Sequence, residues 1–399
     1  MIFLLLVPVY LAINGYILFR TSKWLRICTT FTHSNIWAWC YMGIYILLAF
    51  SLLFAFILPK SRLQLAIKHI SNYWLGTFMY TLIFIAIGDF IKIVLRKLNM
   101  LPDNIYHSDK SFVIAGSVIL ALIVSLSVYG IVHAHKLKVV DYTVDINKPC
   151  VGNDSLKIVL ISDLHLGYSV GVKDMEDMVR KVNAQNADIV VLAGDIFDND
   201  YDALDDPDRL CELLGSMNSR YGTYGCYGNH DIEERLLGGF SVDFNNNNLR
   251  DEKMEDFMKK TGIHMLLDEC ILIDNSFYLA GRLDIEKPGS ANIDKRLTAN
   301  ELLEGIDYSK PVIVMDHQPK KLKELANAGC DLDLSGHTHD GQLFPGNVVS
   351  GIVCENVCGL KTVGNMTSVV TAGVGLWGPN MRVGTTADIT VVNVNFNNN

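Results

Sequence analysis

Residues 157–167 read KIVLISDLHLG, an unbroken apolar run followed at once by Ser162, Asp163, His165 and Gly167. An apolar run of this length is typical of a strand that is buried on both faces of a sheet. Helical periodicity over residues 174–182 and a second apolar run at 189–192 (IVVL) come next. The stretch therefore predicts a strand–helix–strand unit in which Asp163 and His165 follow the end of a strand.

Polar side chains follow four later strand-like runs in the same way. Asp195 comes after IVVL, GNHD (228–231) after residues 221–227, DH (316–317) after 311–315, and SGHTHDGQ (335–342) after 331–334. Further strands are expected at 270–280, 369–372 and 387–395, and helices at 204–217, 251–261 and 320–328. Because strands outnumber helices toward the C-terminus, we expect a mixed sheet, or paired sheets with outer helices.

Five strand ends with carboxylate, amide or imidazole groups indicate one shared site. Taken alone, the two histidines of SGHTH would fit an ordinary polar loop equally well. Ligands of open parallel sheets gather at the carboxyl ends of the strands, however, so five such ends favour a common site.

The donors at these strand ends are all nitrogen or oxygen atoms. Seven donors are too many for one tetrahedral zinc ion and suit two metal ions that share a carboxylate. Imidazole and carboxylate without thiolate favour manganese, iron or zinc. The predicted ligands are Asp163, His165, Asp195, Asn229, His317, His337 and His339.

The N-terminal third of the chain has a different composition. Residues 1–135 carry ten Lys/Arg and three Asp/Glu, a net charge of +7, whereas the remainder carries a net −16. Four apolar runs are each long enough to approach or cross a hydrocarbon core of about 30 Å, which takes roughly 20 helical residues. They are residues 2–19, 36–58, 73–95 and 112–134. We therefore expect an integral, multi-pass protein of the cell membrane.

The distribution of charged residues and cysteines bears on which side of the membrane residues 136–399 lie. Basic residues follow the first apolar run, which favours an outside N-terminus; four spans would then leave the C-terminal part outside as well. The opposing signal is nine scattered cysteines without a framework spacing, which favour a reducing compartment. The charge pattern predicts an extracytoplasmic domain.

The ordered blocks D-x-H, G-D-x-x-D, G-N-H-D, a lone histidine and G-H-x-H resemble the calcineurin-like metallophosphoesterase superfamily. The flanking SDLHLG and GHTHDGQ are most similar to its membrane-associated, YkuE-like branch, which usually has glycine where this chain has Asp340. The resemblance implies an αββα sandwich, with two mixed β-sheets flanked by helices, following an N-terminal multi-span α-helical region. It divides the chain into a membrane region (1–135, about four transmembrane helices), a linker (136–155) and a metallophosphoesterase domain (156–396).

The resemblance also implies roles for single residues. Asp163, His165 and His339 would hold one metal, Asn229, His317 and His337 the other, and Asp195 would bridge them. His230 would face the substrate, and Asp231 would orient its imidazole.

This arrangement predicts a membrane-anchored phosphoesterase that hydrolyses phosphomonoesters or phosphodiesters by attack of a metal-bound hydroxide, with His230 protonating the leaving group. The alternatives are a pyrophosphatase of lipid-linked nucleotides, similar to a UDP-diacylglucosamine hydrolase, and a non-catalytic membrane scaffold or sensor. The expected partner is a phosphoester substrate, and a lipid-linked phosphoester is one candidate. No nucleic acid is expected as a partner, because an acidic domain repels polyphosphate chains.

Overall fold

The computed structural model divides the chain into two compact units. The first comprises residues 1–132 with 379–381, and the second residues 133–378 with 382–399. The structure describes residues 2–234, 236–237, 240–241, 249–289 and 295–397, with the backbone alone at 2–6, 236–237 and 240–241.

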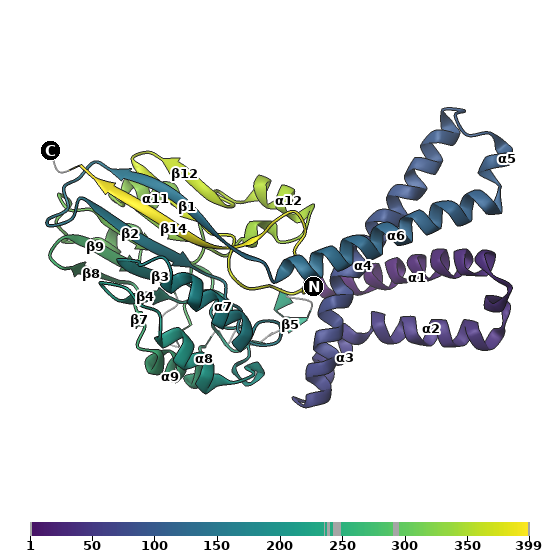
Figure 1. Cartoon of the computed structure of the whole chain (residues 1–399), viewed down its shortest axis with the longest axis horizontal. Helices are drawn as coiled ribbons and strands as arrows, with labels where there is room; N and C mark the ends of the chain where they lie inside the picture. The colour runs from purple at the N-terminus through teal and green to yellow at the C-terminus, as the bar shows by residue number, and fades with distance from the viewer. Residues whose placement is uncertain (1, 235, 238–239, 242–248, 290–294, 398–399) are drawn as a thin grey trace. The chain divides into compact units, whose positions relative to one another are not determined.

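The first unit is helical (Figure 1). Among the described residues, two helices, α4 and α6, are long and apolar enough to cross a membrane. The pair α2 and α3 bends by 50° and makes a third span if the two helices act as one. The predicted run at 2–19 lies in α1, so the number of four spans stays a prediction. The elements are α1 (Ile2–Cys28), η1 (Thr30–His33), α2 (Asn35–Ala49), α3 (Ser51–Ile57), α4 (Arg62–Lys97), α5 (Asp103–Tyr106) and α6 (Asp109–Ala134).

A small apolar core and one polar cluster hold α1 against its neighbours. Ile17 packs in a cluster with Tyr45 of α2 and Phe78 of α4. The carboxylate of Asp89 in α4 accepts hydrogen bonds from Tyr16 and Arg20 of α1. An ion pair within apolar helices satisfies both charges, which would be costly to leave unpaired in lipid.

The second unit contains two six-stranded sheets. Their strand orders are β1-β14-β2-β3-β4-β7 and β12-β13-β11-β10-β9-β8, and both are mixed, because β14 runs antiparallel to β2 and β12 antiparallel to β13. The strands are β1 (Leu137–Ile146), β2 (Ser155–Ile161), β3 (Ile189–Ala193), β4 (Thr223–Cys226), β7 (His264–Met265), β8 (Glu269–Ile273), β9 (Phe277–Gly281), β10 (Val312–Met315), β11 (Leu332–Ser335), β12 (Gly359–Val363), β13 (Met366–Val370) and β14 (Ala387–Phe396); β5 (Leu236–Leu237) and β6 (Phe240–Ser241) form a small hairpin.

The apolar run of β2 is buried on both faces, as its sequence predicts. Ile158 and Leu160 join one core cluster with side chains of β10 and β11, so this cluster lies between the two sheets. Val159 and Ile161 point the other way, into a second cluster. Successive side chains of a strand face opposite sides, so a strand between two apolar layers needs apolar residues at every position.

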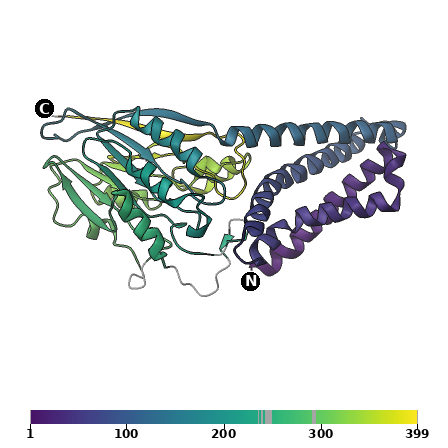
Figure 2. The ribbon, with the colours of Figure 1, turned by 60° about the horizontal axis from the view of Figure 1, so that its bottom comes forward.

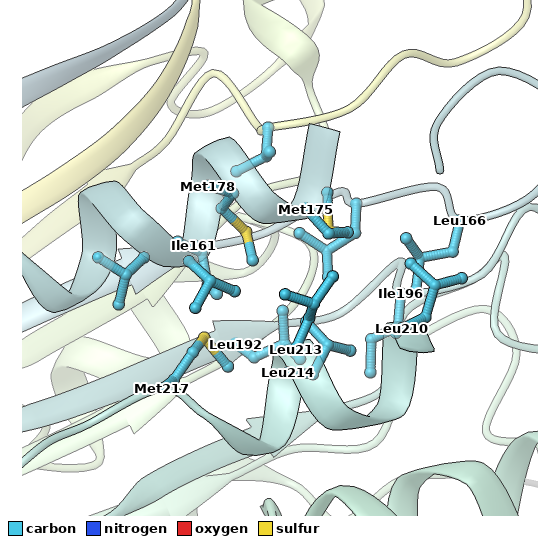
Figure 3. Close-up of a cluster of buried hydrophobic side chains, with 14 of the residues drawn as sticks. Ile161, Leu166, Met175, Met178, Leu192, Ile196, Leu210, Leu213, Leu214 and Met217 are labelled. Atoms are coloured by element: carbon cyan, nitrogen blue, oxygen red, sulfur yellow. The ribbon is translucent and has the colours of Figure 1, made fainter. Parts of the chain in front are cut away.

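Helices cover the outer face of each sheet. Met175, Met178 and Val182 of α7 recur at helical spacing and belong to one core cluster with side chains of α8 and α9 on the first sheet. Figure 3 shows Met175 and Met178 in this cluster with Leu210 and Leu213 of α8. Burying each such side chain contributes about 1.5–3 kcal/mol. The helices of this unit are α7 (Val172–Asn183), α8 (Pro207–Gly215), α9 (Glu252–Thr261), α10 (Ala299–Leu302), α11 (Leu322–Asn327) and α12 (Gly346–Val353), with turns η2 (Tyr201–Ala203) and η3 (His339–Gly341). The αββα sandwich is therefore confirmed.

The segment predicted as a linker, residues 136–155, contains strand β1. Two residues separate the end of α6 from the start of β1 (Figure 2), and β1 pairs with β14 along ten positions, Leu137 with Ala387 through to Ile146 with Phe396. β1 is an edge strand with an exposed side. Its sequence mixes polar and apolar residues and lacks the continuous apolar run by which the buried strands are predicted.

Candidate metal centre

The predicted donors follow five parallel strands drawn from both sheets. β2, β3 and β4 are neighbours in the first sheet, and β10 and β11 are neighbours in the second. Asp163, Asp195 and Asn229 come from the first sheet, and His317 and His337 come from the second. The two layers therefore bring their strand ends to one place, and the donor set is split between them.

The donors form two adjacent clusters. The ligand atoms of Asp163, His165 and His339 lie within 4.8 Å of one another, and so do those of Asp195, His317 and His337. His165 Nε2 is 3.0 Å from His339 Nε2, and His337 Nδ1 is 3.2 Å from His317 Nε2. A proton can lie on only one nitrogen of each facing pair, whereas a cation could bind both lone pairs.

Asp195 connects the two clusters. Its Oδ2 lies 3.1 Å from His317 Nε2 in one cluster and 3.7 Å from His165 Nε2 in the other. Its Oδ1 accepts the backbone N–H of His230 at 2.8 Å. A single carboxylate thus lies where a ligand bridging two cations would lie.

Several of the donor residues have a left-handed backbone conformation, which orients their side chains. Five donors have positive φ: Asp163 (55°), His165 (46°), Asp195 (51°), His337 (73°) and His339 (50°). Residues other than glycine adopt this region at a cost of about 1–2 kcal/mol each, and such strain collects at functional sites.

Two glycines allow the donor loops to approach each other. A Cβ at position 228 would overlap Asp195 Oδ1, and one at position 336 would overlap Ser162 Oγ and Asp163 Oδ2. The glycines in GNHD and GHTH are therefore required by close packing of one donor loop on another.

The donor set fits metal ions. Asp163 and Asp195 are fully buried, and their ion pairs are to histidines. Burial raises the pKa of Asp163. Burial also acts to raise the pKa of Asp195, but the neighbouring histidines together, His317 foremost, hold that pKa well below the usual range. Asn229 Oδ1 is buried without a hydrogen-bond partner. Buried carboxylates and an unpaired acceptor are costly unless a cation satisfies them.

The structure corrects the orienting role predicted for Asp231. The Asp231 carboxylate instead accepts the backbone N–H groups of Ile196, Phe197 and Gly228, and burial followed by the charge of Asp195 raises its pKa to about 7. Three backbone donors hold this carboxylate in the loop framework and away from the imidazole that precedes it in the sequence.

Asn199 takes that orienting position. His230 Nδ1 is hydrogen-bonded to Asn199 Oδ1, and Asn199 Nδ2 donates to Ile232 O at 3.1 Å, which fixes the amide so that its oxygen faces the ring. His230 Nδ1 is therefore the donor, and Nε2 is left for other partners. Burial lowers the pKa of His230 to about 4.

Two acidic residues near the motifs have different surroundings. Asp198 groups with His165 and His230, with its Oδ1 3.7 Å from His165 Nδ1. Asp340 belongs to none of the three clusters found in the described part of the chain. Its φ is 52°, a conformation that suits the glycine usual at this position, and one that aspartate tolerates better than most residues.

Charged residues outside the sequence motifs also support the donor loops. Arg382 is fully buried and donates to the carbonyl oxygens of Ala372, Gly375 and His339. Arg296 donates to Asp316, the residue before His317, at 2.8 and 2.9 Å. Neither arginine lies in a recognisable motif, so only the packed structure identifies these contacts.

Comparison with known proteins identifies related sequences. The family model for calcineurin-like phosphoesterases matches residues 156–341. A transmembrane protein with a metallophosphoesterase domain from Danio rerio is 33% identical over 68% of this chain and 61% of its own length. An uncharacterised metallophosphoesterase of Campylobacter jejuni is 30% identical over 79% of this chain and 78% of its own, and YkuE of Bacillus subtilis is 25% identical over 66% and 87%. The chain thus spans less than two thirds of the length of the first of these relatives.

Proposed function

The chain belongs to the calcineurin-like metallophosphoesterase family, and we propose from this premise that it is a membrane-anchored phosphoesterase with a dinuclear metal centre. The observation that carries the proposal is the pair of adjacent donor clusters connected by Asp195. The apolar helices α4 and α6, and the transmembrane relative, support the anchoring.

We assign one metal to Asp163, His165 and His339, and the other to Asn229, His317 and His337, with Asp195 shared. Two bound cations would supply an ionised water at neutral pH and would stabilise the attacking and leaving oxygens of a displacement at phosphorus. Manganese, iron and zinc all suit this donor set.

His230 is proposed as the group that protonates the leaving oxygen. Its Nδ1 is held by Asn199, so Nε2 must carry the transferred proton, and the ring must then be an imidazolium. Burial lowers its pKa to about 4, and the metal cations would also disfavour the imidazolium, whereas the negative charge of a bound phosphoester would favour it.

Hydrolysis is tested with the full chain purified in detergent. In the presence of Mn²⁺ it is expected to hydrolyse an aryl phosphomonoester or an aryl phosphodiester, and a lipid phosphodiester in mixed micelles would reveal the lipid-linked alternative. The matched control is Asp195→Asn, which is expected to be inactive. Two bound ions without hydrolysis of any of these compounds, or of a lipid-linked nucleotide, would favour the scaffold instead.

The second unit is proposed to lie outside the cytoplasmic membrane, where it would act on envelope or extracellular phosphoesters. A membrane-impermeant lysine label on intact cells is expected to modify Lys253, Lys259 and Lys321, whose side chains are 56%, 71% and 60% exposed. Lysines suit this test because the unit's cysteines are buried or half-buried. Labelling of these three only after lysis would place the unit in the cytoplasm.

A further inference from the structure

Helix α12 (Gly346–Val353) carries the most exposed apolar side chains of the second unit. None of its eight residues is buried, and Ile352 and Val353 are 80% and 73% exposed. Val348 and Val349, one turn earlier, are more than half exposed, as is Phe344 just before the helix. Contiguous exposed apolar side chains of this kind mark an interaction surface.

The sequence around α12 has no charged residue. Residues 341–354 read GQLFPGNVVSGIVC, without Asp, Glu, Lys or Arg. The exposed face of α9 in the same unit, by contrast, is rich in charge, as in its sequence EKMEDFMKKT. Water therefore solvates α9 as an ordinary surface helix, whereas α12 has only apolar and small uncharged side chains to present.

The chain's connection to α6 indicates what covers this helix. α6 ends at Ala134 and β1 begins at Leu137, and α6 is long and apolar enough to cross a membrane. Two intervening residues extend at most about 7 Å. With α6 crossing the bilayer as proposed above, the start of the second unit would be held at the bilayer surface, where lipid is present at far higher concentration than any second protein.

We propose that α12 inserts its apolar side chains into the headgroup region of the bilayer that holds α6. Val348, Val349, Ile352 and Val353 recur at i, i+1, i+4 and i+5, which places them on one helical face. A short helix with such a face binds in the plane of the interface by burying it among headgroups and upper acyl chains.

Insertion of α12 would also set the distance of the metal centre from the lipid. α12 follows η3, which contains His339, and Gly341 packs so closely on the start of α12 that a Cβ there would overlap Asn347. The helix cannot shift without moving this turn. Insertion of α12 would therefore hold the metal centre at a defined distance from the lipid, in addition to the anchoring by α6 that is proposed above.

Fluorescence quenching tests the insertion in the full chain. The background carries Cys28→Ser and Cys40→Ser, because these two thiols are exposed. Ile352→Cys, or Leu272→Cys in β8 as the matched control at 40% exposure, is labelled with an environment-sensitive fluorophore, and the chain is reconstituted into phosphatidylcholine–phosphatidylglycerol vesicles. Nitroxide lipids labelled near the headgroup are expected to quench position 352 about threefold more strongly than position 272.

A second substitution separates insertion from other causes. Val349→Asp in the Ile352→Cys chain is expected to abolish the extra quenching and leave the unfolding temperature unchanged, because Val349 is exposed and a carboxylate resists insertion. Equal quenching at 352 and 272 would overturn the proposal. The proposal would also be overturned if the fluorophore at 352 were shielded from water but not quenched by the nitroxide lipids, and if this shielding increased with the number of protein molecules per vesicle. A second copy of the chain would then cover the helix. Failure of membrane anchoring would be distinct, because the protein would not float with the vesicles after alkaline washing.

Discussion

Asp195→Ala is expected to lower the metal content of the purified protein from about two ions per chain to nearly none. Asp195 Oδ2 is within 3.7 Å of a histidine nitrogen in each donor cluster, so its loss removes a ligand from both proposed sites. Elemental analysis of the protein after gel filtration in metal-free buffer measures the change, and hydrolysis is expected to be lost with the metal.

Two variants control for damage to the fold. Asp195→Asn keeps an Oδ1 acceptor for the backbone N–H of His230 and is still expected to lose most of the metal, because an amide is a far weaker bridging ligand than a carboxylate. Asp177→Ala, a partly exposed position on α7, is expected to keep both ions. One bound ion per chain that survives Asp195→Ala would refute the dinuclear centre.

His230→Ala is expected to keep both metal ions and to lower the turnover of an alkyl phosphoester by about 10²–10⁴-fold. The imidazole is the proposed source of the proton that an alkoxide needs when it departs. The loss is expected to shrink markedly for p-nitrophenyl esters, because p-nitrophenolate departs without protonation. Steady-state kinetics with both substrates measure the difference.

Asn199 provides the matched test of positioning. Asn199→Ala removes the acceptor of His230 Nδ1 and is expected to cause a smaller loss with the same dependence on the leaving group. Asn199→Asp restores an acceptor and is expected to recover much of the alkyl ester activity. Equal losses with alkyl and p-nitrophenyl substrates in His230→Ala would argue against proton donation by this residue.

The fold class and the donor types could be predicted from the sequence because both depend on local patterns. A strand buried on both faces must be apolar throughout, which IVLI (158–161) shows directly, and the helical spacing of α7 is equally plain. The polar motifs lie directly after such strands, so their common location follows from the geometry of parallel sheets. The apolar runs of the first 135 residues indicate membrane helices by length and composition alone.

Other features depend on contacts between distant segments, which no local pattern encodes. β1 is a strand because β14, some 250 residues later, pairs with it. His230 is hydrogen-bonded to Asn199, whereas the Asp231 carboxylate accepts three backbone N–H groups. The exposure of α12 does not follow from its sequence either, because an apolar helix is expected in a protein core unless the structure shows that no neighbour covers it. The sequence by itself determined which groups could bind metal and which elements would form; the tertiary structure decided which side chains are partners and which face is left uncovered, because both depend on the packing of segments far apart in the chain.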